Sequence, residues 1–509
     1  MAIATVLSVG LIGLKAFVVQ VQAFVSPGLP YFSIIGLPDA SLSEARERVR
    51  SACQACGFPW PQTRVTVNLS PASLPKRGSS HDLAIAASVM AASRAIPIDS
   101  LERTVVLGEL NLDGSVLPVN GLLPIMLRVR ERGIQRVVVP AANLGEAGLV
   151  EGVEVVGVRH VGELIRMLGG RATVPDLPSA VPDADAGPES MEAAEPPGDM
   201  AEVLGQEQAK WALQVAAAGG HHILMVGPPG SGKTMLASRM PGIMCPLDEE
   251  AQLEVASIRS LCGTLRRHGI TDVPPFEAPH HTSSMASLVG GGTGVAQPGV
   301  ITRAHRGVLF MDEAPEFSTR ALQTLREPLE SGFVVLSRAK GSAWYPARFQ
   351  LVMAANPCPC GMHYGTGERC MCRERDRMRY FGRLSGPILD RIDIQTNLLP
   401  VGGLGRDGGG GGEPSAVIRR RVMEARGAAR ERFAATGWSC NARASGEWLR
   451  ANTPGQALAL VDRALAKELL TLRGADRALR LAWTLADLSG LESPGVGEME
   501  QGIAMRTRL

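Results

Sequence analysis

The stretch from Gly227 to Thr234 constrains the fold more than any other part of this 509-residue chain. It reads Gly-Pro-Pro-Gly-Ser-Gly-Lys-Thr and matches the pattern G-x-x-x-x-G-K-[ST] at every fixed position. The mostly apolar residues 222–226 are typical of a buried strand, and residues 235–239 suit a helix. Strand, glycine loop and helix in this order bring backbone N–H groups together at the positive end of a helix dipole, where they bind phosphate. A glycine turn with a chance lysine would not explain both flanks.

Each residue of this loop has an expected part in ATP binding. Gly230 and Gly232 allow backbone angles that a Cβ atom would hinder. The Lys233 ammonium would contact the β- and γ-phosphates, and the Thr234 hydroxyl would ligate Mg²⁺. The predicted ATP-binding loop consists of Gly227, Pro228, Pro229, Gly230, Ser231, Gly232, Lys233 and Thr234.

Two later apolar segments end in polar residues that would complete a hydrolytic site. Residues 307–311 read as a strand followed by Asp312 and Glu313. Asp312 would hold Mg²⁺ through water, and Glu313 would polarise the attacking water. The next strand, residues 350–355, delivers Asn356 to a position beside it, where an amide can orient water or the γ-phosphate. A strand that ends in a solvated acidic loop is the competing interpretation.

The segment 385–393 resembles an element of the MCM helicases and of magnesium-chelatase ATPase subunits. In those families its arginine reaches the nucleotide of a neighbouring subunit and stabilises charge in the transition state. The resemblance assigns this role to Arg391, with Arg383 as the second candidate. An arginine that acts on a neighbour implies a ring, which we expect to be a homo-hexamer. A local salt bridge on a helix face is the alternative.

Composition indicates a globular protein of about three domains. The net charge is +2 and 45% of the residues are hydrophobic, so any contact with DNA must use local patches. Nine cysteines in a chain of this length are not a secreted disulfide framework, which favours a reducing cytoplasm. Residues 1–25 are apolar enough to suggest an anchor, but Lys15, Gln20 and Gln22 interrupt them and residues 19–23 alternate like a strand. We therefore expect a cytoplasmic protein without a membrane segment.

The chain is expected to be a multidomain α/β protein. Residues 1–170 alternate strand and helix patterns, 171–200 form an acidic, proline-rich linker that would let the first domain move, 201–402 form the ATPase core, and 413–509 form a helical lid after five consecutive glycines. In the first domain we predict strands at 17–25, 64–69, 104–107 and 136–139 and helices at 42–56, 82–93 and 122–132. In the lid we predict helices at 414–433, 458–472 and 476–488.

Residues 75–80 and 108–122 resemble the protease domain of the Lon family, which uses a Ser–Lys pair. Ser80 falls at the nucleophile position, but Leu123 stands where the lysine is expected, and leucine cannot act as a base. Lys76 and Lys15 remain as possible substitutes, but neither matches the motif. The resemblance therefore implies the fold without peptidase activity, and Ser80 is interpreted as a helix N-cap.

Four cysteines between the core strands and the lid have a spacing that can hold metal. Cys358 and Cys360 form one C-x-C pair, and Cys370 and Cys372 form another. Positions i and i+2 of an extended chain face the same way, so each pair can offer two thiolates to a structural Zn²⁺. Four reduced cysteines that pack a loop are the alternative. Arginines, Tyr380 and Phe381 near the cluster suit either a DNA-contacting surface or a solvated helix that faces another subunit.

Two other sets of possible ligands are interpreted as structural. Cys53 and Cys56 form a C-x-x-C pair without a second pair, and ordinary packing in a helix explains them. His280 and His281 would point apart on a strand, which disfavours a shared metal.

The motifs APHHTSSMASLVGGG, PGVITRAHRGVLFMDEAPEF, NPCPCG and SGPILDRID, with GLPYFSIIGLPDASLSEARERVR in the first domain, resemble the YifB/ComM family of magnesium-chelatase-like AAA+ proteins. The resemblance covers nearly the whole chain outside the linker and the glycine run. It implies a Lon-protease-like first domain, an AAA+ core and a helical lid. It also implies a hexameric helicase that drives branch migration of DNA in recombination and natural transformation, with a glycine-rich pore hairpin and, as further partners, recombination proteins.

The same resemblance places Arg473 near the γ-phosphate, in the sensor position of the lid, with Arg477 as a lower-ranked candidate and a surface arginine as the alternative. Other functions remain open. A magnesium-chelatase-like remodeller would act on a protein partner, but the Lon-like first domain and the cysteine cluster are not features of the metal-chelatase subunit. A Lon-like peptidase is opposed by Leu123, and an ATP-regulated scaffold is opposed by Glu313, Asn356 and Arg391 together.

Overall fold

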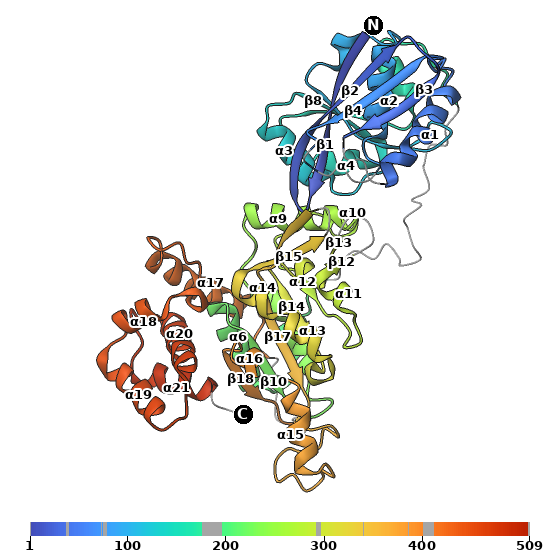
Figure 1. Cartoon of the computed structure of the whole chain (residues 1–509). Helices are drawn as coiled ribbons and strands as arrows, with labels where there is room; N and C mark the ends of the chain where they lie inside the picture. The colour runs from blue at the N-terminus through green and yellow to red at the C-terminus, as the bar shows by residue number, and fades with distance from the viewer. Residues whose placement is uncertain are drawn as a thin grey trace.

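The computed structural model describes residues 2–36, 40–72, 74, 79–175, 196–291, 297–338, 341–384, 386–400 and 412–506. In Figure 1 the first domain lies at the top, the core below it, and a group of C-terminal helices at the left of the core. None of the helices in these ranges combines the length and apolar composition that a bilayer crossing requires.

The first domain is built on a mixed sheet with the strand order β3-β4-β2-β1-β5-β8-β9. Alternate residues of β2, such as Val19 and Val21, are fully buried, as the period of a half-buried strand requires. Helix α2 is buried along its whole length beneath the sheet. The strands are β1 (Ala2–Ile12), β2 (Lys15–Ser26), β3 (Tyr31–Ile35), β4 (Arg64–Ser70), β5 (Thr104–Val106), β8 (Arg136–Pro140) and β9 (Glu154–Val158), with the small pair β6 (Glu109–Leu110) and β7 (Val116–Leu117). The helices are α1 (Ala40–Ala55), α2 (Asp82–Ala92), α3 (Leu122–Glu131), α4 (Leu144–Ala147) and α5 (Val161–Met167).

All seven elements predicted in this domain are confirmed, with ends that differ by at most two residues. Three strands of the main sheet, β1, β3 and β9, and the short pair β6 and β7 were not predicted. The apolar N-terminal segment is a hairpin, in which β1 pairs antiparallel with β2 from Ala2↔Val25 to Ile12↔Lys15. The apolar residues of this segment therefore pack in the sheet of the first domain.

The core contains a parallel sheet with the order β11-β14-β17-β10-β18. Strands β10, β14 and β17 are buried at every position, because helices cover both faces. The strands are β10 (Ile223–Val226), β11 (Phe276–Glu277), β14 (Val308–Met311), β17 (Gln350–Ala355) and β18 (Ile394–Asn397). The helices are α6 (Glu207–Gly219), α7 (Lys233–Ser238), α8 (Met240–Ile243), α9 (Glu249–Leu261), α10 (Leu265–His268), α11 (Met285–Val289), α12 (Val300–Arg303), α13 (Thr319–Thr324), α14 (Arg326–Ser331), α15 (Glu374–Gly382) and α16 (Gly386–Leu389).

Two hairpins extend from the core. Strand β12 (Gly290–Gly291) pairs with β13 (Gln297–Pro298), and β15 (Phe333–Arg338) pairs with β16 (Gly341–Pro346). The expected pore hairpin corresponds to the first pair, and its tip, residues 292–296, lies outside the described residues. The second hairpin reaches the first domain, where a Cβ atom at Gly13 would lie 2.8 Å from the carbonyl oxygen of Trp344.

The C-terminal helices pack around α20, which lies against α17, α21 and the core helix α6. The predicted helices at 414–433 and 476–488 are confirmed, whereas that at 458–472 is confirmed only as far as Ala466. The chain turns at Glu468, which has a φ of 56°, and α20 begins after Thr471, whose side chain accepts a hydrogen bond from Gly474 N. The helices are α17 (Ser415–Arg432), α18 (Gly446–Asn452), α19 (Gly455–Ala466), α20 (Leu472–Leu488) and α21 (Val496–Arg506).

The first domain is packed directly on core helix α9. Gly121 N donates to the Ser260 carbonyl at 3.0 Å, and Leu123 N donates to Ser260 Oγ at 3.1 Å. Ala256 and Leu265 of the core also belong to the apolar cluster around α3. Most of the expected linker, residues 176–195, lies outside the described residues. These contacts join the first domain to the core in this structure, and its movement on the linker stays a prediction.

The residues that resemble Lon lie around the starts of α2 and α3. Leu123 is fully buried, and its backbone N–H also donates to Glu146 Oε1 at 3.0 Å. His81, and not Ser80, is the N-cap of α2, so the predicted cap is wrong by one residue. Lys15 is exposed at the start of β2, and Lys76 lies outside the described residues. The relation of this domain to Lon stays a prediction.

Candidate nucleotide site and arginine pocket

The predicted phosphate loop joins β10 to α7 at the carboxyl end of the parallel sheet, where α/β proteins bind ligands. Gly230 and Gly232 have φ angles of 74° and 89°, and a Cβ atom at either would have no neighbour within 4 Å. Both glycines are therefore required by backbone conformation, and the space above them is open to a phosphate chain.

Lys233 connects this loop to the end of β17. Its ammonium donates to the carbonyls of Gly227 at 2.7 Å and Pro228 at 2.9 Å, and to Asn356 Oδ1 at 3.2 Å. Burial lowers the pKa of Lys233, against the opposite influence of Asp312 and Glu313. The structure thus brings Asn356 to the loop, as the sequence predicts.

The two predicted magnesium ligands are also in contact. Thr234 Oγ1 donates to Asp312 Oδ2 at 2.7 Å, although the residues are 78 positions apart. Hydroxyl and carboxylate oxygens side by side below a phosphate loop are the donors that Mg²⁺ prefers. These two side chains would hold the ion, and the ion would neutralise charge on the transferred phosphate.

Glu313 has a backbone conformation that is rare outside glycine, with φ of 49° and ψ of 43°. Glu313 lies two residues after the end of β14, and its backbone N–H donates to Asp312 Oδ1 at 2.9 Å. Such local conformations are retained where the surroundings enforce them, often at functional sites. The Glu313 side chain is 52% exposed, so water can reach its carboxylate.

His281 approaches this glutamate, a contact that the sequence analysis missed. Its Nδ1 lies 3.3 Å from Glu313 Oε2. The expectation that His280 and His281 point apart is wrong, since their ring centroids are 4.1 Å apart with an interplanar angle of 33°. The reason is that both residues lie in an irregular segment after β11 and not in a strand. No sequence spacing indicates the contact between His281 and Glu313.

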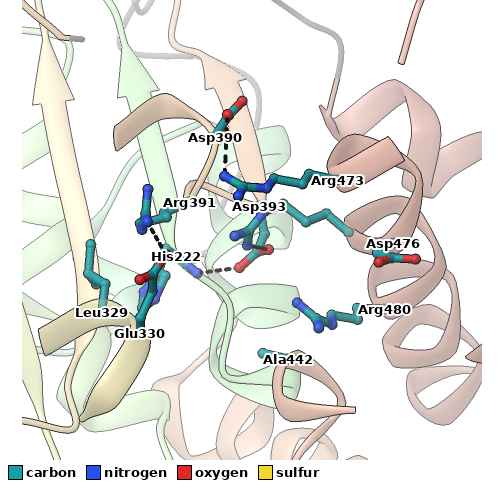
Figure 2. Close-up of a pocket in the computed structure, with 11 residues that line it drawn as sticks. His222, Leu329, Glu330, Asp390, Arg391, Asp393, Ala442, Arg473, Asp476 and Arg480 are labelled. Atoms are coloured by element: carbon teal, nitrogen blue, oxygen red, sulfur yellow. Dashed lines mark hydrogen bonds and ion pairs between the residues drawn. The ribbon is translucent and has the colours of Figure 1, made fainter. Parts of the chain in front are cut away.

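Three of the predicted arginines, Arg391, Arg473 and Arg477, line a pocket between the core and the C-terminal helices (Figure 2). Arg391 is only 8% exposed, and its guanidinium bonds Glu330 and the carbonyl of Pro387. Arg473 is exposed, with Nη1 4.0 Å from Asp390 Oδ2. Arg383 lies elsewhere and donates to Glu316 Oε2 at 2.9 Å. Arg391 and Arg383 therefore each form a local ion pair in the single chain, as the alternative to a role at a neighbour's nucleotide requires.

This pocket lies at the amino end of the strands. Residues Ile223 and Ile394 are paired, so His222 and Asp393 mark the start of β10 and β18, whereas the phosphate loop follows Val226. Four strand residues span about 13 Å at a rise of ~3.3 Å per residue. Arg391 and Arg473 therefore lie at the end of these strands opposite the phosphate loop of their own chain. The sensor role of Arg473 stays a prediction.

A buried network joins the core to α20 beneath the pocket. Arg477 pairs with Asp393, His221 Nε2 lies 2.7 Å from Thr484 Oγ1, and His222 Nδ1 accepts from Leu351 N at 3.0 Å. Burial lowers the pKa of His222 to about 4. Burial alone would raise the pKa of Asp393, but Arg477 and the two histidines outweigh it and hold that pKa well below its usual range. Arg477 is thus a structural partner of Asp393.

The four cysteines of the two C-x-C pairs come together after β17, as predicted. Cys53 and Cys56 are buried in the core of the first domain, and Cys56 Sγ donates to the Cys53 carbonyl at 3.0 Å. Burial raises the pKa of both thiols, in agreement with ordinary packing.

Three family descriptions match most of the chain. Magnesium chelatase, subunit ChlI, matches residues 199–402; subunit ChlI of Mg-chelatase matches 21–143; and the ChlI C-terminal description matches 412–506. Among similar proteins, an uncharacterized protein of Mycobacterium tuberculosis is 47% identical over 99% of both chains. Competence protein ComM of Haemophilus influenzae is 38% identical over 96% of this chain and 94% of its own. Uncharacterized protein YifB of Escherichia coli is 40% identical over 82% of this chain and 80% of its own.

Proposed function

Because the chain belongs to the YifB/ComM family of magnesium-chelatase-like AAA+ ATPases, we propose that it is a hexameric motor that uses ATP to drive branch migration of DNA in recombination or natural transformation. The observation that carries the proposal is the meeting of Lys233, Thr234, Asp312 and Asn356 at one sheet edge, with Glu313 beside them. The name of the Haemophilus relative, a competence protein, supports the choice of DNA as substrate.

Hydrolysis follows from the placement of these side chains. Lys233 would bind the terminal phosphates, and Thr234 and Asp312 would hold the metal that accompanies ATP. Glu313, at a solvent-accessible position, accepts a proton from the attacking water as that water bonds to the γ-phosphorus. Asn356 fixes the position of Lys233 through their hydrogen bond. The bond to the β-phosphate oxygen then breaks, giving ADP and phosphate.

A ring explains the position of Arg391. It lies at the sheet end opposite the phosphate loop, a position that suits contact with the nucleotide of a neighbouring chain. A positive charge added at the γ-phosphate from a neighbour would couple hydrolysis to assembly. In that case Glu330 holds the guanidinium until the neighbour's nucleotide replaces it.

Exposed arginines near the cysteine cluster provide a surface for DNA. They belong to α15 and to the loop before it, which stand out from the core at the bottom of Figure 1. Arg377 Nη1 is 3.4 Å from His363 Nδ1, and Glu368, Glu374 and Asp376 lie among the arginines. The exposed members are Arg369, Arg373, Arg375 and Arg379. A local patch of this kind suits phosphate contacts in a chain with little net charge.

The proposal is tested on a labelled four-way DNA junction with ATP and Mg²⁺. Wild-type protein should convert the junction into forked products, and Lys233→Ala and Glu313→Gln proteins should not. The conversion should also fail with wild-type protein when ATP is omitted. A wild-type protein that hydrolyses ATP and leaves the junction intact and unbound would refute the DNA motor.

That outcome would favour a second candidate, a remodeller of a protein partner. Its support is that all three family descriptions name a magnesium-chelatase subunit. The two candidates share the ATP site and differ in what the motion of the ring acts on. Peptidase activity is not proposed, because Leu123 is buried and carries no basic group.

A further inference from the structure

The sulfur atoms of the four clustered cysteines lie close together in space. Cys358 Sγ lies 3.3 Å from Cys360 Sγ and 3.7 Å from Cys370 Sγ, and the sulfurs of Cys360 and Cys370 are 3.9 Å apart. All four sulfurs, that of Cys372 included, lie within 4.8 Å of one another. Two separate segments, one after β17 and one before α15, supply them.

These distances fit a tetrahedral metal site. With a Zn–S bond of about 2.3 Å, the sulfurs of a regular ZnS₄ tetrahedron are about 3.8 Å apart. A disulfide would need about 2.05 Å between its sulfurs, far less than any separation here. We propose that Cys358, Cys360, Cys370 and Cys372 bind one structural Zn²⁺ ion.

The backbone around the cluster supports thiolate ligands. The N–H groups of Met362 and His363 face Cys358, and those of Met362 and Met371 face Cys360. Hydrogen bonds from amide groups to a sulfur stabilise its negative charge and orient it toward a metal. Gly361 makes this turn with a φ of 75°, and its N–H donates to the Cys358 carbonyl at 2.9 Å.

The site is joined to the ATP site through the same turn. Cys358 follows Asn356 by two residues, and a Cβ atom at Gly361 would lie 2.5 Å from Pro229 Cδ of the phosphate loop. The Tyr380 hydroxyl of α15 contacts the backbone of Asn356 on the other side. Zinc bound at this site would therefore hold the segment that carries Asn356 in contact with the phosphate loop. It would also fix the position of the start of α15. This role goes beyond the proposed DNA motor and does not depend on it.

Metal analysis of the full-length protein tests the site directly. Protein purified without chelators should contain one zinc per chain by elemental analysis, and a mercurial thiol reagent should release it to a chromogenic chelator. Growth with cobalt should give the intense charge-transfer and visible bands of tetrahedral thiolate Co²⁺. Zinc below about a tenth of an equivalent, or iron in its place, would overturn the assignment.

Variants assign the metal to these residues. Cys372→Ser, at a half-buried position, should lower the zinc content and lose the cobalt charge-transfer band. Cys262→Ser, at another half-buried cysteine far along the chain from the cluster, should keep both. Equal zinc in the two variants, or a disulfide within the cluster found by mass spectrometry of unreduced wild-type protein, would refute the site even if a cluster variant folded poorly.

Discussion

Lys233 and Asn356 are 123 positions apart in the chain, yet Lys233 Nζ lies 3.2 Å from Asn356 Oδ1. The lysine also donates to two carbonyls of its own loop, so Asn356 is the one partner that connects it to another strand among those described. Through this bond, the phosphate loop and the end of β17 are positioned together. Any change that shifts β17 should therefore also shift Lys233 relative to the ATP phosphates.

Lys233→Ala and Glu313→Gln should both abolish turnover for different reasons. Loss of Lys233 removes a charge that binds phosphates, so nucleotide affinity should fall together with hydrolysis. Glu313→Gln removes only the base, so kcat should fall about 10²- to 10⁴-fold while ATP still binds. Titration with a fluorescent ATP analogue beside a phosphate-release assay separates the two. Equal loss of affinity in both variants would contradict these roles.

Arg391→Ala should lower ATP hydrolysis by a factor on the order of 10³ if the arginine acts on a neighbour's nucleotide. Mixing inactive Arg391→Ala and Glu313→Gln proteins should then restore roughly a quarter of the wild-type rate, because random assembly gives that share of interfaces both intact groups. Arg383→Ala in the same mixture is the matched test of the second candidate. If no mixture recovers activity while the subunits exchange, Arg391 is a structural partner of Glu330.

Acid should destabilise the junction between core and C-terminal helices through His222. Its pKa of about 4 lies below the ordinary 6.5, so the folded protein binds this proton more weakly than the unfolded chain. The contribution to stability is present above pH 6.5 and is lost as the pH falls toward 4, by at most about 1.4 kcal/mol per unit. His222→Asn keeps an acceptor for Leu351 N without a titrating group.

The measurement is the urea midpoint of both proteins between pH 7 and about pH 5. The midpoint of the wild type should fall more steeply than that of His222→Asn, since all other groups are shared. His221, whose pKa burial also lowers, remains in both proteins. Parallel curves would show that His222 does not titrate as the structure indicates.

Gly361→Ala should impair the ATP site through packing. Its φ of 75° disfavours any side chain, and the new methyl group would lie 2.5 Å from Pro229 Cδ. Gly365→Ala is a matched control, because Gly365 has a φ of 59° but no neighbour within 4 Å of a Cβ atom. We expect kcat/KM for ATP to fall on the order of tenfold or more in Gly361→Ala only, since small displacements at a reacting site are costly. Equal effects in steady-state assays would attribute the loss to backbone strain alone.

The hydrolytic residues were predictable because each stands at a fixed place in a local pattern. Lys233 and Thr234 belong to one continuous motif, and Asp312 and Asn356 each follow an apolar strand of a parallel sheet. The carboxyl ends of such strands meet at one edge, so chain order alone places the side chains together. The four cysteines were predictable for a similar reason, since their spacing is local.

The remaining features depend on contacts that no local pattern contains. Strand β1 lacks polar alternation, so the sequence did not predict it as a strand. The turn at Glu468 uses a left-handed residue that is not glycine, so helical periodicity continued across it. His281 and Glu330 became partners of Glu313 and Arg391 only through tertiary packing.

Strand β10 separates the phosphate loop from the pocket that holds Arg391, and each chain therefore has two unlike faces. If these faces meet, a pair related by a two-fold axis would set like against like and leave both nucleotides without an arginine. In the proposed ring, productive contacts would run head to tail, and the oligomer would have a direction around its circumference. In a short open chain of subunits, the ATP of one terminal subunit would lack an arginine from a neighbour. Closing the ring would supply that arginine.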